Sequence, residues 1–183
     1  MVAGIIIAVV VVVLVVVCIW MYNNLVRLRN RVDNAWSQID VQLQRRLDLI
    51  PNLVETVKGY AKHESKTLQD VTDARAACMK ATAPAERAKA ANQLEGTLKT
   101  LFASVEAYPD LKASQNFLDL QGQLRDTEDK ISYMRQSYND TVMKFNNAIQ
   151  TFPGNVFAGM FHFEARELYD ADEAAQTVPE TRF

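Results

Sequence analysis

Glycine, proline, cysteine and histidine are all scarce in this sequence of 183 residues. Six glycines and five prolines are too few for the many tight turns of a loop-rich β protein. The two cysteines cannot form a disulfide framework, because Cys18 lies inside an apolar run and Cys78 lies far along the chain. These shortages exclude a disulfide-stapled domain and favour a helical one.

An excess of charge of one sign is also absent. Twenty basic residues nearly balance 22 acidic residues, so the formal net charge is −2 at pH 7 and the pI is near 5.7. Proteins that bind nucleic acid usually carry a basic excess. We therefore expect no nucleic acid among the partners.

Sequence motifs for catalysis and for metal binding are missing as well. The two histidines, His63 and His162, fit neither the two-histidine zinc motif nor the Glu-x-x-His pairs of di-iron bundles. The sequence also lacks a glycine-rich phosphate loop, a cysteine pair at metal spacing and a nucleophile elbow. We expect no enzymatic activity, no catalytic residues, no bound metal and no cofactor.

The first 22 residues form the one long uncharged run. Val2 to Tyr22 covers 21 residues, about 31 Å as an α-helix, which is close to the hydrocarbon thickness of a bilayer. Trp20 and Tyr22 stand at its end, where amphipathic rings prefer the headgroup region. The run predicts a transmembrane helix over residues 1–22. A cleaved signal peptide is disfavoured, because no basic residue precedes the run and no small-x-small site follows it.

Three arginines follow the apolar run within ten residues: Arg27, Arg29 and Arg31. Positive charge next to a membrane helix tends to stay on the cytoplasmic side, so we expect the C-terminal domain to be cytoplasmic. The arginines also suit contact with anionic lipid headgroups. The alternative is a solvated helix face that only sets the topology.

The remaining sequence has helical periodicity. From Leu25 to Ile50 apolar residues step by three or four in a near-heptad seam, without proline or glycine. Pro51 lacks an amide donor, so we expect the helix to kink or restart there. Later prolines separate further helical segments. The predicted fold class is all-α, with an N-terminal transmembrane helix continuing into an up-and-down bundle of about four long helices.

We expect three parts: the transmembrane helix 1–22, a helical-bundle domain over residues 23–152, and a tail over residues 153–183. The tail starts with aromatic residues and then becomes acidic, with a helical pattern over residues 165–175. The aromatic residues fit three roles: a cap on the open end of the bundle, an interfacial membrane contact, or a subunit contact. For the last role, the candidate assembly contact consists of Phe157, Met160, Phe161 and Phe163.

Polar residues gather around Pro51. A proline inside a helix frees a carbonyl, and arginine or asparagine side chains can donate to it. We expect a structural clamp at the kink formed by Arg45, Arg46, Asp48, Pro51 and Asn52. A binding site for an anion or a partner is the alternative. The later carboxylates Asp126, Glu128 and Asp129 spread over more than one helix face and suggest a solvated surface.

Four motifs resemble those of the LemA family: AWSQIDVQL at residues 35–43, RRLDLIPNLV at 45–54, AYPDL at 107–111 and FPGN at 152–155. The resemblance implies a bacterial single-pass membrane protein with a helical-bundle domain. It implies no reaction, because no enzymatic activity or catalytic residue is established for the family. Some members carry a lipoprotein-type start, but Val17 before Cys18 departs from that pattern, so we expect the helix itself to be the anchor.

The favoured function is a non-enzymatic, membrane-anchored helical scaffold that self-assembles at the inner membrane. Long near-heptad seams and the apolar tail motivate self-assembly. Relatives associated with magnetosome membrane formation suggest that the scaffold organises or shapes membrane. The alternative is an adaptor that recruits another membrane protein, such as a protease or a sensor. The expected partners are the lipid bilayer, further copies of the chain and, for an adaptor, that second protein.

Overall fold

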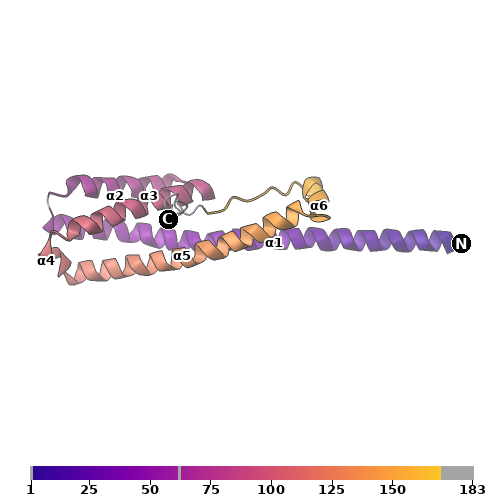
Figure 1. The fold of residues 1–183 in the computed structure, drawn as a ribbon, viewed down its shortest axis with the longest axis horizontal. Coiled ribbons are helices and arrows are strands. Elements are labelled where there is room, and N and C mark those ends of the chain that lie inside the picture. Colours follow the sequence, from indigo (N-terminus) through magenta and orange to yellow (C-terminus); the bar gives the residue numbers. More distant parts are fainter. Residues whose placement is uncertain (1, 62, 170–183) are drawn as a thin grey trace, which may run out of the picture. The chain divides into compact units, whose positions relative to one another are not determined.

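The computed structural model describes residues 2–61 and 63–169. Figure 1 shows its helices, which are α1 (Val2–Tyr60), α2 (Ser65–Lys80), α3 (Pro84–Val105), α4 (Pro109–Lys112), α5 (Gln115–Gln150) and α6 (Gly154–Phe161). These residues contain no β-strand, so the predicted all-α class is confirmed. Four of the helices are long, in agreement with the predicted number of long helices, and the short helices α4 and α6 are additional to the prediction.

Helix α1 runs without a break from the apolar run into the rest of the chain. Within the described ranges it is the only helix long and apolar enough to cross a membrane, and none of its most apolar stretch is buried. It continues through Pro51 to Tyr60, so the helix does not restart at the proline.

The described chain divides into two compact units, each considered separately below. The first contains residues 2–36 and 136–168, and the second contains residues 37–135 and Tyr169. Both α1 and α5 contribute residues to each unit.

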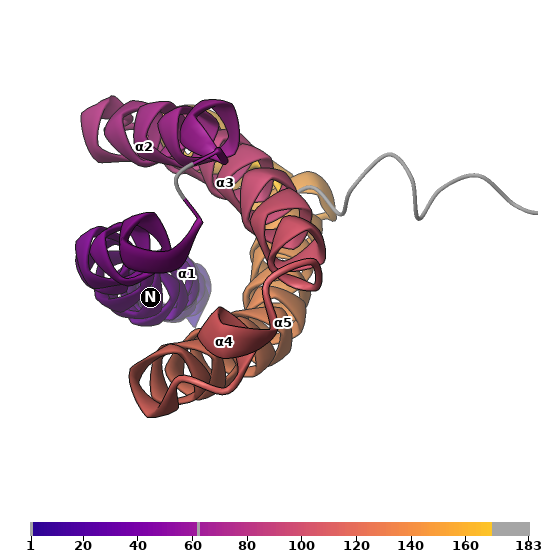
Figure 2. The same ribbon diagram turned by 90° about the vertical axis from the view of Figure 1, so that its left-hand side faces the viewer.

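In the second unit, α2 and α3 lie side by side, as Figures 1 and 2 both show. Its core is built from the apolar stripes of α1, α2, α3 and α5. Apolar residues from the stripes of these helices are buried there, including Ile39, Leu43, Leu47, Ile50, Val57, Leu68, Val71, Ala91, Leu94, Leu101, Phe117, Leu124 and Ile131. Burial of these stripes is what holds helices of modest intrinsic stability together.

In the first unit, α1 packs against the end of α5. Leu25 and Val32 of α1 and Val142 and Phe145 of α5 are buried. The indole of Trp36 meets the ring of Tyr138 edge-on, with the ring centroids 5.7 Å apart. The aromatic residue of the AWSQIDVQL motif therefore has a packing role.

Helix α6 follows a tight turn that requires glycine. A Cβ atom on Gly154 would lie 1.9 Å from the carbonyl oxygen of Ala148, a distance that no side chain tolerates. The FPGN motif therefore lets α6 pack directly against the end of α5. Phe152 lies beyond the end of α5 at Gln150 and is 82% exposed.

Residues 163–169 form an extended segment that we call the strap. The predicted helix over residues 165–175 is wrong as far as Tyr169, and its remaining residues lie outside the described ones. Side chains of α5 hold the backbone of the strap. The Asn146 side chain accepts a hydrogen bond from the Arg166 amide at 2.9 Å and donates one to the Arg166 carbonyl at 2.8 Å. The Tyr138 hydroxyl donates to the Glu167 carbonyl at 3.1 Å.

Replacing Asn146 with alanine is expected to release the strap. The change removes both hydrogen bonds to Arg166, each worth about 1 kcal/mol, and leaves α5 itself intact. Hydrogen exchange measured by mass spectrometry should show faster exchange of the Arg166 amide, with unchanged exchange in α2 and α3. Unchanged exchange at Arg166 would contradict the strap.

Candidate functional site

The predicted membrane-interface residues lie where the apolar part of α1 ends. Trp20 and Tyr22 are exposed, as are Arg27, Arg29 and Arg31. The Tyr22 ring contacts two aromatic residues that follow α5, with centroid distances of 4.8 Å to Phe161 and 6.0 Å to Phe163. The guanidinium of Arg29 lies 5.3 Å from the centre of the Phe163 ring, within the range of a cation–π contact.

The four residues of the predicted assembly contact differ in solvent exposure. Phe163 packs between Tyr22 and Phe145, and Phe157 is half-buried. Phe161 is 45% exposed beside Tyr22, and Met160 is 62% exposed. Only Met160 and Phe161 therefore offer substantial surface to another molecule.

The carbonyl freed by Pro51 is that of Leu47, four residues earlier in the helix. The Nε of Arg75, on α2, donates a hydrogen bond to this carbonyl oxygen at 2.8 Å. An arginine thus satisfies the freed carbonyl as expected, but it comes from a different helix and is not one of the predicted clamp residues. Because α2 supplies the missing donor, α1 can continue through the proline.

The other predicted clamp residues make separate contacts. Arg45 is exposed and lies 3.8 Å from Asp126. The Asp48 carboxylate accepts a hydrogen bond from Gln44 at 2.9 Å, and the Asn52 carbonyl accepts one from Thr56 at 2.8 Å. These contacts do not form one clamp around Pro51.

Arg46 is the largest fully buried side chain, with 2% of its surface exposed. It forms an ion pair with Glu128 of α5, and its Nη1 atom is buried without a hydrogen-bond partner among the described residues. Glu128 therefore does not belong to a solvated carboxylate surface, contrary to the expectation for residues 126–129. One member of that cluster faces the interior of the second unit.

More charged groups surround this ion pair. Glu95 of α3 pairs with Lys99 at 2.6 Å and with Arg135 at 3.5 Å. Burial alone would raise the pKa of Glu95, but the hydrogen bond and charge of Lys99, together with the two arginines, hold the pKa below its usual value. Burial raises the pKa of Glu128, and the charge of Arg46 offsets only part of that effect. Of the two carboxylates, Glu128 is the easier one to protonate.

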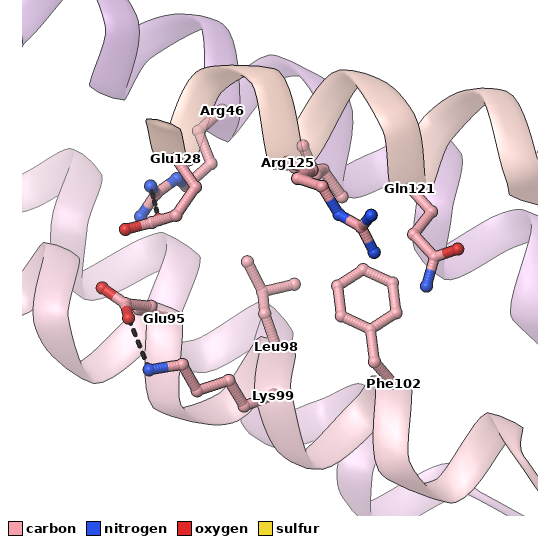
Figure 3. Close-up of a pocket in the computed structure, with 9 residues that line it drawn as sticks. Arg46, Glu95, Leu98, Lys99, Phe102, Gln121, Arg125 and Glu128 are labelled. Carbon is pink, nitrogen blue, oxygen red and sulfur yellow. Dashed lines mark hydrogen bonds and ion pairs between the residues drawn. The ribbon is translucent and has the colours of Figure 1, made fainter. Parts of the chain in front are cut away.

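A hollow of about 330 Å³ in the second unit, drawn in Figure 3, is bordered by four of these groups: Arg46, Glu95, Lys99 and Glu128. Its apolar lining comes from Leu98, Phe102 and Leu124, and Arg125 and Gln121 stand across from Phe102. Neither a histidine nor a hydroxyl or thiol nucleophile lines it. Across the part of the chain that the structure describes, no three metal-ligating side chains come together. The hollow can hold a small ligand or a side chain of a partner.

The interior arginines and glutamates can be recognised in the sequence, because they occupy positions on the apolar stripes of their helices. Arg46 follows Leu43 by three residues, Glu128 follows Leu124 by four, and Arg135 precedes Tyr138 by three. A charged residue on the apolar stripe of a helix must be paired when it is buried. Such interruptions of a stripe therefore predict buried ion pairs, although not their partners.

The thiol of Cys78 is fully buried, and burial raises its pKa. Because the thiolate is the reactive form, we expect this cysteine to resist alkylation by iodoacetamide at pH 8 in the folded protein. Mass spectrometry should find modification at Cys78 only after denaturation. Rapid modification of the native protein would contradict the burial.

Comparisons with known proteins give a consistent result. A family model described as LemA family matches residues 35–183. Protein LemA of Metamycoplasma hominis is 29% identical over 163 residues, covering 87% of this chain and 73% of the relative. Magnetosome protein MamQ of Magnetospirillum gryphiswaldense is 24% identical over 182 residues, covering 85% of this chain and 67% of the relative. With the apolar stretch of α1, these similarities indicate a membrane-associated helical protein.

Proposed function

Because this chain belongs to the LemA family, we propose that it is a membrane-anchored helical scaffold without enzymatic activity, which assembles with copies of itself at the bacterial inner membrane. The observation that carries the proposal is the unbroken course of α1 from Val2 to Tyr60. An apolar stretch able to span a bilayer and core residues of both units lie on this one helix. The candidate membrane span and part of the helical core therefore belong to one continuous element.

We propose that the C-terminal domain faces the cytoplasm. Arg27, Arg29 and Arg31 support this orientation, because they are exposed immediately after the apolar run. The similarity to two proteins named as magnetosome proteins supports a role in organising or shaping membrane.

The proposed assembly contact is the half-exposed aromatic pair of Tyr22 and Phe161. Two exposed rings that adjoin the end of a membrane helix offer apolar area that a second copy can cover. Of the four predicted residues, this contact retains Phe161. It leaves out Phe163, which packs within the chain, Phe157, which is half-buried, and Met160, which lies on another face of α6.

Measuring the mass of the full-length protein in lipid nanodiscs tests self-assembly. We expect several copies per particle for the natural protein and fewer for Phe161→Ser. Leu118→Ser is the matched control, because Leu118 is 43% exposed but lies on α5 in the second unit. A single copy of the natural protein in each particle would overturn self-assembly, and equal effects of the two variants would overturn the contact.

An adaptor that recruits another membrane protein is the second candidate. The hollow bordered by Arg125, Lys99 and Phe102 favours it, because a partner's apolar side chain with an adjacent carboxylate fits this lining. Crosslinking from position 125 in cells should then recover one membrane protein in near-equal amount. Recovery of the same chain alone would support the scaffold instead.

A further inference from the structure

We infer that α6 is a second membrane contact, whose outward apolar side chains enter the boundary between headgroups and acyl chains of anionic lipid. This inference rests on the membrane anchoring by α1 proposed above, but it does not depend on self-assembly. It concerns a different face of α6 from the one that carries Phe161.

The location of α6 is the first step. It lies beside α1 where the apolar stretch ends, as Figure 1 shows. The contact is made by rings, with Tyr22 4.8 Å from Phe161 between centroids. Tyrosine and tryptophan at the end of an apolar run mark the headgroup region, so contact with Tyr22 puts α6 at the depth of the headgroups.

The exposed side chains of α6 are the second step. Val156 and Met160 are four residues apart on one face of the helix, and Phe152 lies in the turn before it. All three are more than half exposed. On the other side of the helix, Gly154 and Ala158 are buried against the first unit. We call Phe152, Val156 and Met160 the apolar ridge.

No charged residue occurs from Phe152 to Phe161. A surface helix of a water-soluble domain usually turns a polar face to the solvent. A helix whose outer side is apolar and which stands at the end of a membrane span instead matches an interfacial helix. Continuity with the membrane span therefore favours lipid over a separate protein as the occupant of the ridge.

Positive charge next to α6 is the third step. A hollow of about 190 Å³ in the first unit is lined by Arg29, His162, Phe163 and Arg166, among others, with Glu164 as its one acidic residue. Arg166 also pairs with Asp33 at 3.2 Å. Arg29 stands over Phe163, and Arg27 and Arg31 are exposed nearby on α1. This charge is suited to the phosphate of an anionic lipid headgroup.

Fluorescence quenching in proteoliposomes of phosphatidylcholine and phosphatidylglycerol tests the contact. The fluorophore nitrobenzoxadiazole is attached at position 160 in the full chain carrying Cys18→Ala and Met160→Cys, and a doxyl group on the lipid acyl chain is the quencher. Cys78 remains in place, because it is buried. The matched control carries Cys18→Ala and Met79→Cys, since Met79 is a methionine of similar exposure in the second unit.

We expect the label at position 160 to lose most of its fluorescence and the label at position 79 to lose none. A third sample, labelled at the natural Cys18, reports on the membrane span itself. Quenching at position 18 without quenching at position 160 would overturn the inference and leave the anchoring intact. That outcome includes the case in which a second copy covers the ridge. Absence of quenching at both positions would overturn the anchoring as well.

A separate comparison tests whether the membrane contact requires arginine and anionic lipid. Arg29→Gln is expected to reduce quenching at position 160, and Arg45→Gln, which changes an exposed arginine of the second unit, is expected to leave it unchanged. For the labelled protein that keeps Arg29, quenching at position 160 should be weaker in vesicles of pure phosphatidylcholine than in the mixture with phosphatidylglycerol. Equal quenching in both lipids and in both variants would overturn the role of anionic headgroups.

Discussion

Replacing Arg46 with methionine is expected to lower the free energy of unfolding by about 1.5–3 kcal/mol, because the Glu128 side chain that it leaves unpaired is 33% exposed and stays partly solvated. Arg46 is buried, and its charge is the partner of Glu128 on α5. Methionine keeps much of the volume but leaves the Glu128 carboxylate beside Glu95 with less compensating charge. The remaining carboxylates must then become protonated or draw in water, and both processes cost free energy.

Urea unfolding of the full-length protein in detergent, followed by circular dichroism, measures this effect. Arg45→Met is the control, because Arg45 is the preceding residue but pairs with Asp126 at the surface. An exposed pair of this kind contributes about 0–1 kcal/mol. Adding Glu128→Gln to Arg46→Met should restore part of the loss, because it removes the unpaired charge. Equal destabilisation by Arg45→Met and Arg46→Met would contradict the buried ion pair.

The second large change in the free energy of unfolding is expected for substitutions of Pro51 and Arg75. Replacing Arg75 with methionine should cost about 1–3 kcal/mol, because the Leu47 carbonyl loses its donor. Replacing Pro51 with alanine should stabilise the protein, because the new amide can donate to that same carbonyl within the helix. With the new amide in place, Arg75→Met should cost less than it does in the natural protein.

A double-mutant cycle of these two substitutions separates this account from simple loss of packing. The free energies of unfolding of the natural protein, the two single variants and the double variant are compared under one set of conditions. We expect a coupling of about 1 kcal/mol or more. Strictly additive effects would show that the Arg75 hydrogen bond does not replace the amide missing at Pro51.

The apolar pattern of the sequence predicts the four long helices and most of the core, because helical burial has a local period, but it does not predict the short helices α4 and α6. The spacing of Ile39, Leu43 and Leu47 alone predicts that they share one face of a helix, and all three are buried. The physical need for a donor near Pro51 was also predictable from the sequence. The identity of that donor was not, since Arg75 lies 28 residues away from Leu47 on another helix.

Contacts between residues far apart in the sequence account for the remaining differences between the expected and the observed structure. The neighbouring carboxylates Asp126 and Asp129 suggest a surface position for Glu128, but its partner Arg46 lies 82 residues earlier in the chain. Residues 165–169 have a helical pattern but form the strap, because Asn146 and Tyr138 bind their backbone. In both cases a contact with another helix outweighs the local preference of the segment.

Anchoring by the first part of α1 underlies the whole account, and the intact mass of the protein in isolated membranes tests it most directly. Membranes washed with alkaline carbonate should retain the protein, and its mass should include residues 2–22. A protein that is released by the wash, with a mass corresponding to a chain that starts after Trp20, would show that the apolar run is removed. That result would contradict membrane anchoring by α1.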